Sequence, residues 1–459
     1  MITTLRNILA IPELRRRLLF TFALLAVYRL GCHLPLPGID LEVLRELMTQ
    51  MQGSLLNYFN VFSGGSVERA AVFALGILPY ISASIMLQVL TVVVPHLEKL
   101  SKEGEAGRQK ITRYTRYGAL LIAAVQSTSI AWGLEQTLAP GGALLVPSPG
   151  WGFRLTTMLT LTAGCAVVMW LGEQMTQRGL GNGISLIIFA GIVVTLPQAA
   201  GELVSKLRYG HLSWPAAAMT ALFFILLTGF IVFMERSQRR IPVQYAKRVM
   251  GRHLQGGQRT YLPLKVNTGG VIPVIFASSV LVIPGTLAGL LPADWAWVRL
   301  LTDAIQSGQP AYYVLLATAI VLFSFVYVSI VFNPQDTASN MRRHGGFVPG
   351  IRSGRPTAEL LDRTLTRLTM IGAVYLAGVV ILPELLIYGL RVDGIPWLGA
   401  GLEELLPGWL IRGIGLDLTF GGTSILIVVA VATDFVHQVE SHLVTHSYDK
   451  LLKQPRGRR

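Results

Sequence analysis

Charged side chains are scarce in this 459-residue chain, at 14% of the sequence against roughly 25% in ordinary soluble domains. Hydrophobic residues make up 52%. A soluble core cannot bury that much apolar surface, whereas a lipid bilayer can, so the composition excludes a set of soluble domains. The two cysteines, Cys32 and Cys165, form no CxxC pair, which excludes a disulfide framework and a cysteine-based zinc or redox motif. We expect both to be small apolar packing residues.

Ionisable groups are also missing from the middle of the apolar runs. Those nearest to the runs all fall toward run ends: Arg29, Glu173, Glu235, Glu384 and Asp434. Ion-coupled transporters hold their coupling ion with such groups near the bilayer centre, so this pattern favours a pathway for a substrate without one fixed charge. No metal site is indicated, because His442 and His446 share a helix face but lack a third ligand. No catalytic residue is indicated either, because no histidine lies mid-run to activate a nucleophile.

Ten apolar runs take up most of the chain, and each is close to the roughly 20 residues that cross about 30 Å of hydrocarbon as a helix. They lie at about 18–36, 72–94, 115–134, 153–172, 184–204, 215–234, 270–291, 311–332, 368–390 and 421–443. The runs are continuous and do not alternate in polarity, which favours helices over barrel strands. The first run lacks a small-residue cleavage pattern and is not expected to be a cleaved signal peptide. We therefore predict an all-α membrane protein with ten transmembrane helices.

Lysine and arginine residues are distributed unevenly between the two sides of the predicted bundle. If the N-terminus lies inside, the inside segments hold thirty of the 39 basic residues, so the positive-inside rule predicts that both termini are cytoplasmic. Two long inside loops, 235–269 and 333–367, mix basic residues with glycine, proline and aromatics. Long ordered loops are typical of functional surfaces, although contact with anionic lipid would serve equally to anchor the topology.

Five runs lie on each side of about residue 210, which predicts two halves, 1–210 and 211–459, of the inverted-repeat kind. The outside segment 37–71 contains a short apolar stretch that is broken by Gly64 and Gly65 and is predicted to fold back into the protein. Taken alone, these features support either a channel or a secondary transporter for a small solute. Co-isolation with a small membrane subunit and stimulation of a cytoplasmic ATPase would indicate the channel.

Eight segments, in order along nearly the whole chain, resemble the SecY family. They are Phe59–Gly65, Ala74–Ser84, Gly104–Arg108, Gly181–Ser185, Pro263–Asn267, Ile272–Ser279, Phe347–Arg352 and Phe420–Ser424. The resemblance implies two pseudo-symmetric five-helix halves around a central hourglass pore that opens sideways between the second and seventh spans. It implies a channel in the bacterial inner membrane that passes unfolded secretory proteins and releases signal sequences and transmembrane segments sideways. Such a chain would need no cofactor and would not itself be an enzyme.

The resemblance also implies partners and site residues. The partners would be SecE-like and SecG-like small membrane subunits, the SecA motor and the translating ribosome. The implied pore ring is Ile77, Ile81, Ile184, Ile188, Ile275 and Ile427, and the implied plug spans about 55–69 with Phe59, Phe62, Ser63, Gly64 and Gly65. The implied lateral gate includes Ser82, Gln126, Ser278 and Ile283, and the partner-binding arginines are Arg252 and Arg352. The chain departs from the family in having His253 where a second arginine is usual, and in a long outside loop at 391–416.

Overall fold

The computed structural model describes residues 11–44, 60, 63–136, 144–210, 213–245, 248–250, 253–255, 259–288, 308–389 and 421–453. Each predicted apolar run overlaps a helix. These helices are α2 (Pro12–Gly31), α5 (Leu78–Val93), α7 (Glu105–Gln136), α8 (Trp151–Arg178), α9 (Gly183–Arg208), α10 (Trp214–Arg236), α11 (Ile272–Ala288), α13 (Pro310–Val331), α15 (Arg355–Tyr388) and α18 (Gly422–Lys453). The predicted outside loop 391–416 lies outside the described residues.

Seven helices in the described part of the chain are long and apolar enough to cross a membrane, and eight if α5 and α6 (Pro95–Lys102) count as one bent span. The bend of 98° between α5 and α6 falls at Val94, which is extended as residues before proline prefer to be. Two helices fall outside this set. One is α2, whose first turns carry charged residues. The other is α11, which is too short at 17 residues. Ten spans therefore remain a prediction.

Two small antiparallel sheets form from the long loops, and the apolar runs alone did not indicate them. The first has the order β4-β1-β5, from β1 (Gln238–Tyr245), β4 (Arg259–Lys265) and β5 (Gly346–Phe347); the second pairs β2 (Arg248–Met250) with β3 (His253–Gln255). Ile241 of β1 lies opposite Leu262 of β4. Ile241 and Leu264 are buried in a cluster with Leu361 and Leu365 of α15. The hairpin is therefore packed on the first turns of α15.

The two long loops are joined to each other. β5 belongs to the second loop and pairs with the end of β1 in the first, with Gln244 opposite Phe347. The second loop also contains α14 (Pro334–Arg343), which Asn333 caps by accepting from the backbone N–H groups of Gln335 and Asp336. α15 begins inside this loop, earlier than the apolar run, because its first turns are polar. Pro356, its second residue, suits a helix start.

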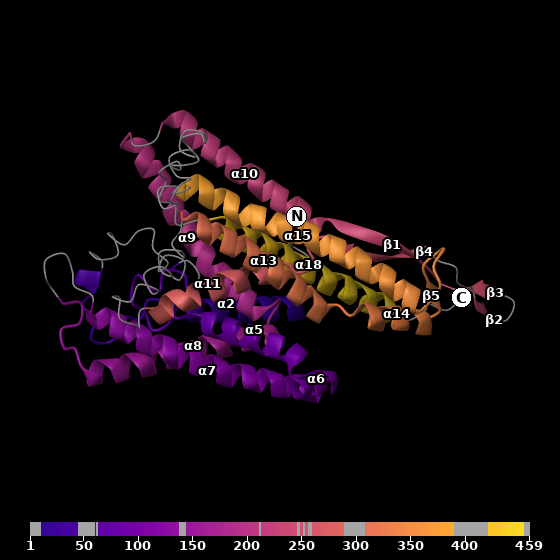
Figure 1. Ribbon diagram of the computed structural model, residues 1–459, viewed down its shortest axis with the longest axis horizontal. Helices are drawn as coiled ribbons and strands as arrows, with labels where there is room; N and C mark the ends of the chain where they lie inside the picture. Colours follow the sequence, from indigo (N-terminus) through magenta and orange to yellow (C-terminus); the bar gives the residue numbers. More distant parts are fainter. Residues whose placement is uncertain are drawn as a thin grey trace.

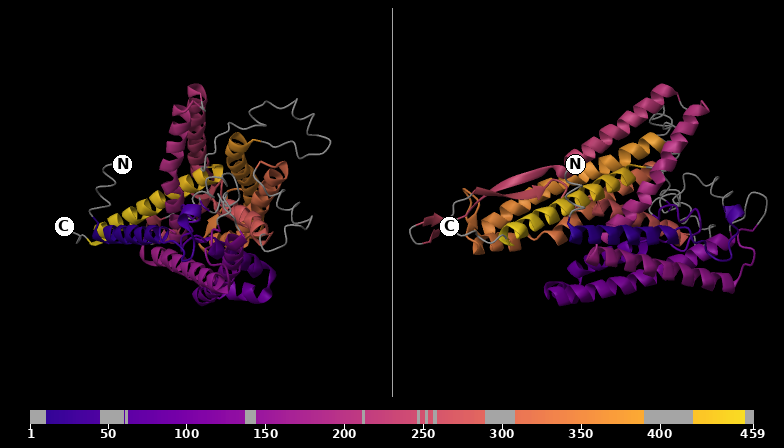
Figure 2. Two further views of the ribbon diagram at one scale, coloured as in Figure 1. Left: turned by 90° about the vertical axis from the view of Figure 1, so that its left-hand side faces the viewer. Right: turned by 180° about the vertical axis from the view of Figure 1, so that it is seen from behind.

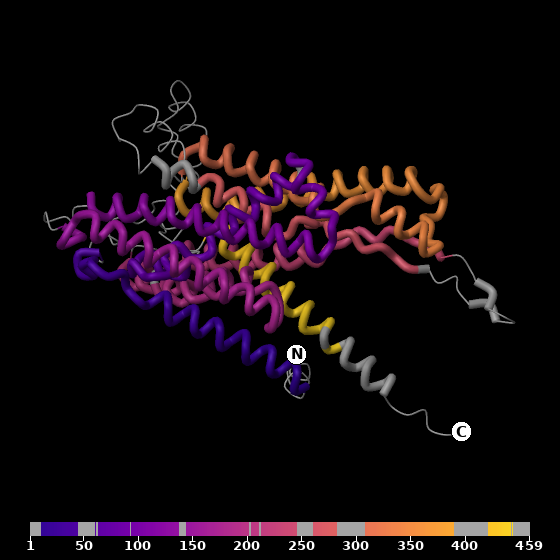
Figure 3. Tube along the Cα trace, turned by 90° about the horizontal axis from the view of Figure 1, so that it is seen from below, coloured from indigo at the N-terminus to yellow at the C-terminus, as the bar shows by residue number. Residues whose placement is uncertain are grey.

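The helices run along the long axis of the molecule (Figure 1), with α2, α5, α7 and α8 on one side and α10, α13, α15 and α18 on the other. Figure 2 shows the same separation from the end and from behind. α9 contacts α8 and α18, and α11 contacts α5, α7 and α13, so these two helices connect the sides. The hairpin β1–β4, α6 and α14 lie toward one end of the bundle, called the loop end below. In Figure 3, α2 (indigo) and the yellow part of α18 extend toward the lower side of the bundle.

Candidate functional site

All six isoleucines of the implied ring lie in or against one large buried cluster, which also contains many other residues. Ile77, Ile81, Ile188, Ile275 and Ile427 belong to one buried hydrophobic cluster, and Ile184 packs against it. They come from the start of α5, the first two turns of α9, the start of α11 and the start of α18. Residues four apart lie on one face of a helix, so Ile184 and Ile188 share one face of α9. We call these six residues the isoleucine ring.

Small residues bring the helices of the ring close to each other. A side chain at Gly172 of α8 would lie 3.3 Å from Ile184 Cγ1 and 3.5 Å from Ile77 Cδ1, so two ring residues meet at this glycine. Gly183, at the start of α9, faces the backbone carbonyl of Gly172. Asn182 caps α9 by accepting from the N–H of Ile184. This cap and the close backbone approach fix the direction in which Ile184 points.

Residues 63–66 form a buried turn that α2 holds through two peptide carbonyls. The carbonyl oxygen of Ser63 accepts from Tyr28 Oη at 3.3 Å, from Ser66 Oγ at 2.6 Å and from Cys32 Sγ at 3.8 Å. The next carbonyl, that of Gly64, accepts from Arg29 Nη1 at 2.6 Å. Ser63 and Ser66 are almost fully buried. We call residues 63–66 the anchored turn, since its carbonyls are satisfied by side chains of another helix.

The anchored turn lies directly beside the isoleucine ring. Gly64 has a φ of +69°, and a side chain there would lie 2.9 Å from the Cα of Gly191, one turn beyond Ile188 in α9. Ser63 Cβ lies 3.7 Å from the position a Cβ would take on Gly76, the residue before Ile77. Gly64 therefore serves two needs at once, a left-handed backbone and a close backbone contact.

Several predicted residues are placed with less detail. Phe59, Phe62 and Arg252 lie outside the described residues, and Ile283 lies in α11. In the implied lateral gate, Ser82 of α5 and Gln126 of α7 are buried and Ser278 of α11 is half-buried. α11 contacts both α5 and α7, so the predicted gate residues sit on helices that adjoin.

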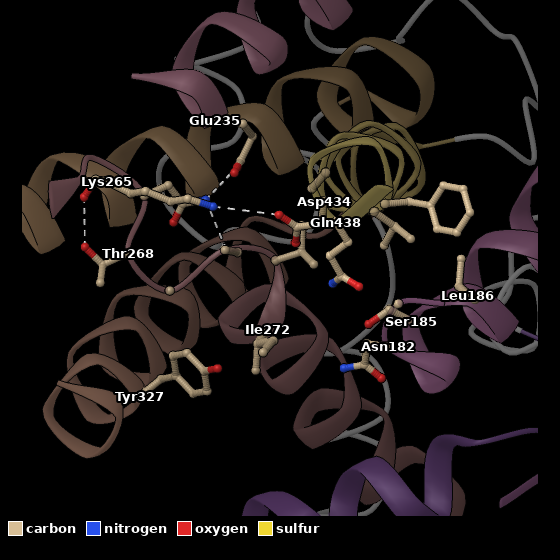
Figure 4. Close-up of a pocket in the computed structure, with 18 residues that line it drawn as sticks. Asn182, Ser185, Leu186, Glu235, Lys265, Thr268, Ile272, Tyr327, Asp434 and Gln438 are labelled. Carbon is tan, nitrogen blue, oxygen red and sulfur yellow. Dashed lines mark hydrogen bonds and ion pairs between the residues drawn. The ribbon is translucent and has the colours of Figure 1, made fainter. Parts of the chain in front are cut away.

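A polar cavity of about 290 Å³ lies at the loop end of the ring (Figure 4). Asn182, Ser185 and Leu186 line it from the start of α9, and Tyr327 and Gln438 line it from α13 and α18. Asn267 Nδ2 donates to Glu235 Oε1 at 2.6 Å and to the carbonyl of Gly270 at 3.1 Å. Lys265 Nζ lies 3.7 Å from Asp434 Oδ1. The cavity thus offers donors and acceptors beside an apolar ring.

Arg352 is exposed at the loop end, just before α15. Its backbone carbonyl accepts from Thr357 Oγ1 at 2.8 Å, which fixes the backbone and leaves the guanidinium facing out. Beside it, a groove of about 710 Å³ runs between α14 and α15 and is lined by Arg342, Arg355 and Asp362. An exposed arginine can form a two-pronged contact with a carboxylate of another molecule.

The residues that hold the anchored turn were missed by the sequence analysis. Arg29 lies inside an apolar run, which is itself a signal of a specific partner, but its position near the run's end gave an easier explanation. Tyr28 and Cys32 carried no signal beyond ordinary packing. Their shared partner is more than thirty residues further along the chain. Only the three-dimensional path of the segment after α2 brings them together.

These features define a multi-pass helical membrane protein in which a buried turn lies beside a large buried apolar cluster. The family model for SecY matches residues 71–436. The protein translocase subunit SecY of Escherichia coli K12 is 46% identical over 444 residues, which cover 96% of this chain and 94% of the relative. The subunit of the same name from Vibrio cholerae is 45% identical, covering 97% and 95%. The chain belongs to the SecY family.

Solved structures share the fold. A structure described as that of a protein conducting channel aligns with a TM-score of 0.64 and 15% identity, covering 94% of this chain and 92% of that one. A structure of SecY reported for its plug domain, which stabilises the closed state, aligns with a TM-score of 0.62 and 16% identity over the same shares. Sec61 from a canine ribosome-channel complex aligns with a TM-score of 0.59 and 14% identity over the same shares.

Proposed function

We propose that this chain is the protein-conducting channel of a bacterial general secretion pathway, passing unfolded secretory proteins across the membrane and releasing transmembrane segments into it. The observation that carries this proposal is the buried isoleucine ring with the anchored turn seated beside it. The ring draws on α5, α9, α11 and α18, which come from early and late parts of the chain. A site built in this way surrounds a passage and does not bind one small solute in a pocket.

An apolar ring suits such a passage for a physical reason. A narrow apolar constriction excludes ions because it does not stay wet. Its flexible side chains can part around a polypeptide, and they offer the passing chain no hydrogen bonds. The polar cavity around Asn182 and Asn267 would receive the peptide groups before they enter the ring. The anchored turn would act as the plug on the other side and withdraw when a substrate enters.

The sideways exit would lie between α5 and α11, the second and seventh spans, where Ser82, Ser278 and Ile283 are found, with Gln126 on the adjoining α7. Polar pairs between helices in a bilayer average only about 0.6 kcal/mol. Helices joined by such weak bonds can part and close again during each insertion event. The two halves, 1–210 and 211–459, would then move apart on that side and remain connected on the other.

The loop end would face the cytoplasm, with both termini on that side of the bacterial inner membrane. The basic residues of the hairpin and of the α14 region would bind the SecA motor and the translating ribosome, with Arg352 and Arg252 as contact points. SecE-like and SecG-like small subunits and anionic lipids would cover apolar surface within the membrane. The chain would be a channel subunit and not an enzyme, and its partners would supply the energy.

Reconstitution tests the proposal directly. Proteoliposomes that contain the chain and its small membrane partners should protect a secretory precursor from protease in the presence of the motor and ATP. The same vesicles should release a precursor with a long apolar segment into the lipid phase. Vesicles in which the precursor stays digestible, although the motor's ATPase activity is stimulated, would contradict the proposal. Uptake of a small solute in place of a polypeptide would favour a transporter.

A further inference from the structure

Two arginine–glutamate pairs connect α7 to α8. Toward the loop end, Arg116 Nε donates to Glu173 Oε1 at 2.7 Å, and Arg116 Nη2 lies 2.6 Å from Glu173 Oε2. Toward the other end, Arg154 Nε donates to Glu135 Oε2 at 2.7 Å, and Arg154 Nη2 lies 2.6 Å from the same oxygen. The side chains of Glu173 and Glu135 are 14% and 6% exposed. We call these pairs the two clamps.

The spacing of the clamps matches the thickness of a bilayer. Arg116 and Glu135 are nineteen residues apart on α7, and Arg154 and Glu173 are nineteen residues apart on α8. At 1.5 Å per residue, each separation is roughly 28 Å, against about 30 Å of hydrocarbon. The two helices are antiparallel neighbours, so one register satisfies both pairs. A slide of one helix along the other would break both clamps together.

Each clamp is reinforced by its surroundings. Glu135 Oε1 also accepts from the N–H of Gly150, the residue before α8, at 2.9 Å. The guanidinium of Arg154 lies 4.4 Å from the ring centre of Trp132 on α7 and 5.5 Å from that of Trp151 on α8. Cation–π contacts of this kind add to the ion pair. Between the clamps, Ser127 Oγ and Thr162 Oγ1 approach to 3.4 Å.

The side of α7 that adjoins α11 is bonded differently. Ser278 Oγ of α11 donates to the carbonyls of Val274 and Ile275 in its own helix. The amide oxygen of Gln126 is buried without a hydrogen-bond partner among the described residues. Small residues pack α5 on α7, where a side chain at Gly118 would lie 3.5 Å from Ala83 Cβ. α7 is thus tied to α8 by charge and packed on α5, while gate residues next to α11 bond within their helix or stay unpaired.

We propose that α7 and α8 move as one rigid hairpin when the channel opens, and that Arg116, Glu135, Arg154 and Glu173 are positioning residues that keep them together. Charged, partly buried pairs are costly to break because each leaves an uncompensated charge. Opening therefore separates α7 from α11 and not α7 from α8. This inference rests on the proposed function, since it concerns how the sideways exit opens.

Covalent cross-links test the hairpin. Ser127→Cys with Thr162→Cys, in a background with Cys32→Ser and Cys165→Ser, places two thiols where the hydroxyl oxygens approach across α7 and α8. Oxidised protein should translocate a precursor within about twofold of the reduced protein. Ser82→Cys with Ser278→Cys, joined by a bifunctional thiol reagent, is the comparison and should stop translocation. Transport by the reduced protein tests the proposed function, whereas the ratio of oxidised to reduced transport tests the hairpin. Reversible loss of transport on oxidation of the α7–α8 pair would overturn it.

Spin labels test the clamps without relying on transport. Leu121 of α7 and Leu159 of α8 are 67% and 64% exposed and can carry labels. The distance between the labels should stay the same when a precursor is trapped in the channel. Glu135→Gln with Glu173→Gln should broaden that distance distribution, and Arg116→Glu with Glu173→Arg should keep it narrower than Glu173→Gln alone. Two results would overturn the proposal. The first is a shift of several ångströms in the label distance when a precursor is trapped in a channel with unmodified clamps. The second is a distance distribution for Arg116→Glu with Glu173→Arg that is as broad as that for Glu173→Gln alone.

Discussion

Arg29 Nη1 in α2 donates to the carbonyl oxygen of Gly64 at 2.6 Å, although 35 residues separate them in the chain. The neighbouring carbonyl of Ser63 is bonded by Tyr28 of the same helix. A hydrogen bond with a charged partner contributes about 1.5–3 kcal/mol to stability. Helix α2 therefore fixes the anchored turn beside the isoleucine ring, and the strongest of its bonds comes from the charged guanidinium of Arg29.

Loss of that charge should open the plug. Arg29→Gln removes the charged donor, and at 1.4 kcal/mol for each factor of ten the displaced population should rise about tenfold or more. Resting ion conductance in planar bilayers should rise with it. Arg17→Gln is the matched control, because Arg17 lies on the same helix and makes a solvent-exposed pair with Glu13. Equal conductance in both variants would contradict a role for Arg29 in holding the turn.

Alanine substitutions at the adjacent Gly64 and Gly65 distinguish the effect of backbone strain from the effect of a steric contact. Gly64 and Gly65 both have positive φ, of +69° and +80°, but only a side chain at Gly64 would meet the backbone of Gly191. Alanine at either position costs about 1–2 kcal/mol for the left-handed backbone. Gly64→Ala adds an overpacking cost of about 1–3 kcal/mol. Gly64→Ala should therefore leak more ions than Gly65→Ala, and the reverse order would place the turn elsewhere.

The natural Cys32 allows the position of the turn to be followed chemically. Cys32 Sγ lies 3.8 Å from the carbonyl oxygen of Ser63, and both residues are buried. Ser63→Cys should form a disulfide with Cys32 under oxidising conditions in the resting channel. A precursor trapped in the channel should reduce the yield severalfold, because the turn must withdraw. Cys32→Ser in the same background is the control, and a yield that ignores the precursor would show that the turn stays in place.

The apolar runs predicted where helices lie, because crossing hydrocarbon requires length and hydropathy that are visible in sequence. They could not show the start of α15, whose first turns are polar, or the strand β1, whose Ile241 and Val243 alternate with polar and proline residues within a basic loop. The isoleucine ring was available only from the family resemblance, since isoleucine in a membrane helix usually contacts lipid or neighbouring helices. The pairing of Arg29 with Gly64 depends on a fold-back that local patterns do not specify.

Reversal of charge at Arg352 should uncouple the motor from the channel. Arg352→Glu replaces an exposed arginine whose backbone is fixed by Thr357, so the fold should be unaffected. We expect motor-driven translocation and stimulated ATPase activity to fall at least tenfold, with membrane insertion and expression unchanged. Arg363→Glu, also exposed on α15, is the control. Arg352→Lys should recover part of the activity, because lysine keeps the charge but not the planar fork. ATPase stimulation that is normal with Arg352→Glu would contradict the assignment.

The isoleucine ring gives the sharpest prediction, because its chemistry can be changed without changing its size greatly. Ile81 and Ile188 are 6% and 2% exposed and belong to the same buried cluster. Asparagine at both positions places amide groups where a dewetted constriction would otherwise exclude water and ions. The paired variant should therefore raise resting chloride or potassium conductance severalfold in planar bilayers, while a polypeptide could still pass.

Matched substitutions on the outside of the bundle decide whether the effect belongs to the ring. Ile225 of α10 and Ile371 of α15 are 68% and 54% exposed, as expected of side chains that face lipid. Asparagine at these two positions introduces the same polar groups into the membrane, but away from the ring. Their conductance should stay at the level of the unmodified channel. Equal leak from both pairs would mean that the substitutions disturb the fold generally. If Ile81→Asn with Ile188→Asn left the resting conductance unchanged, the passage would be closed by other residues.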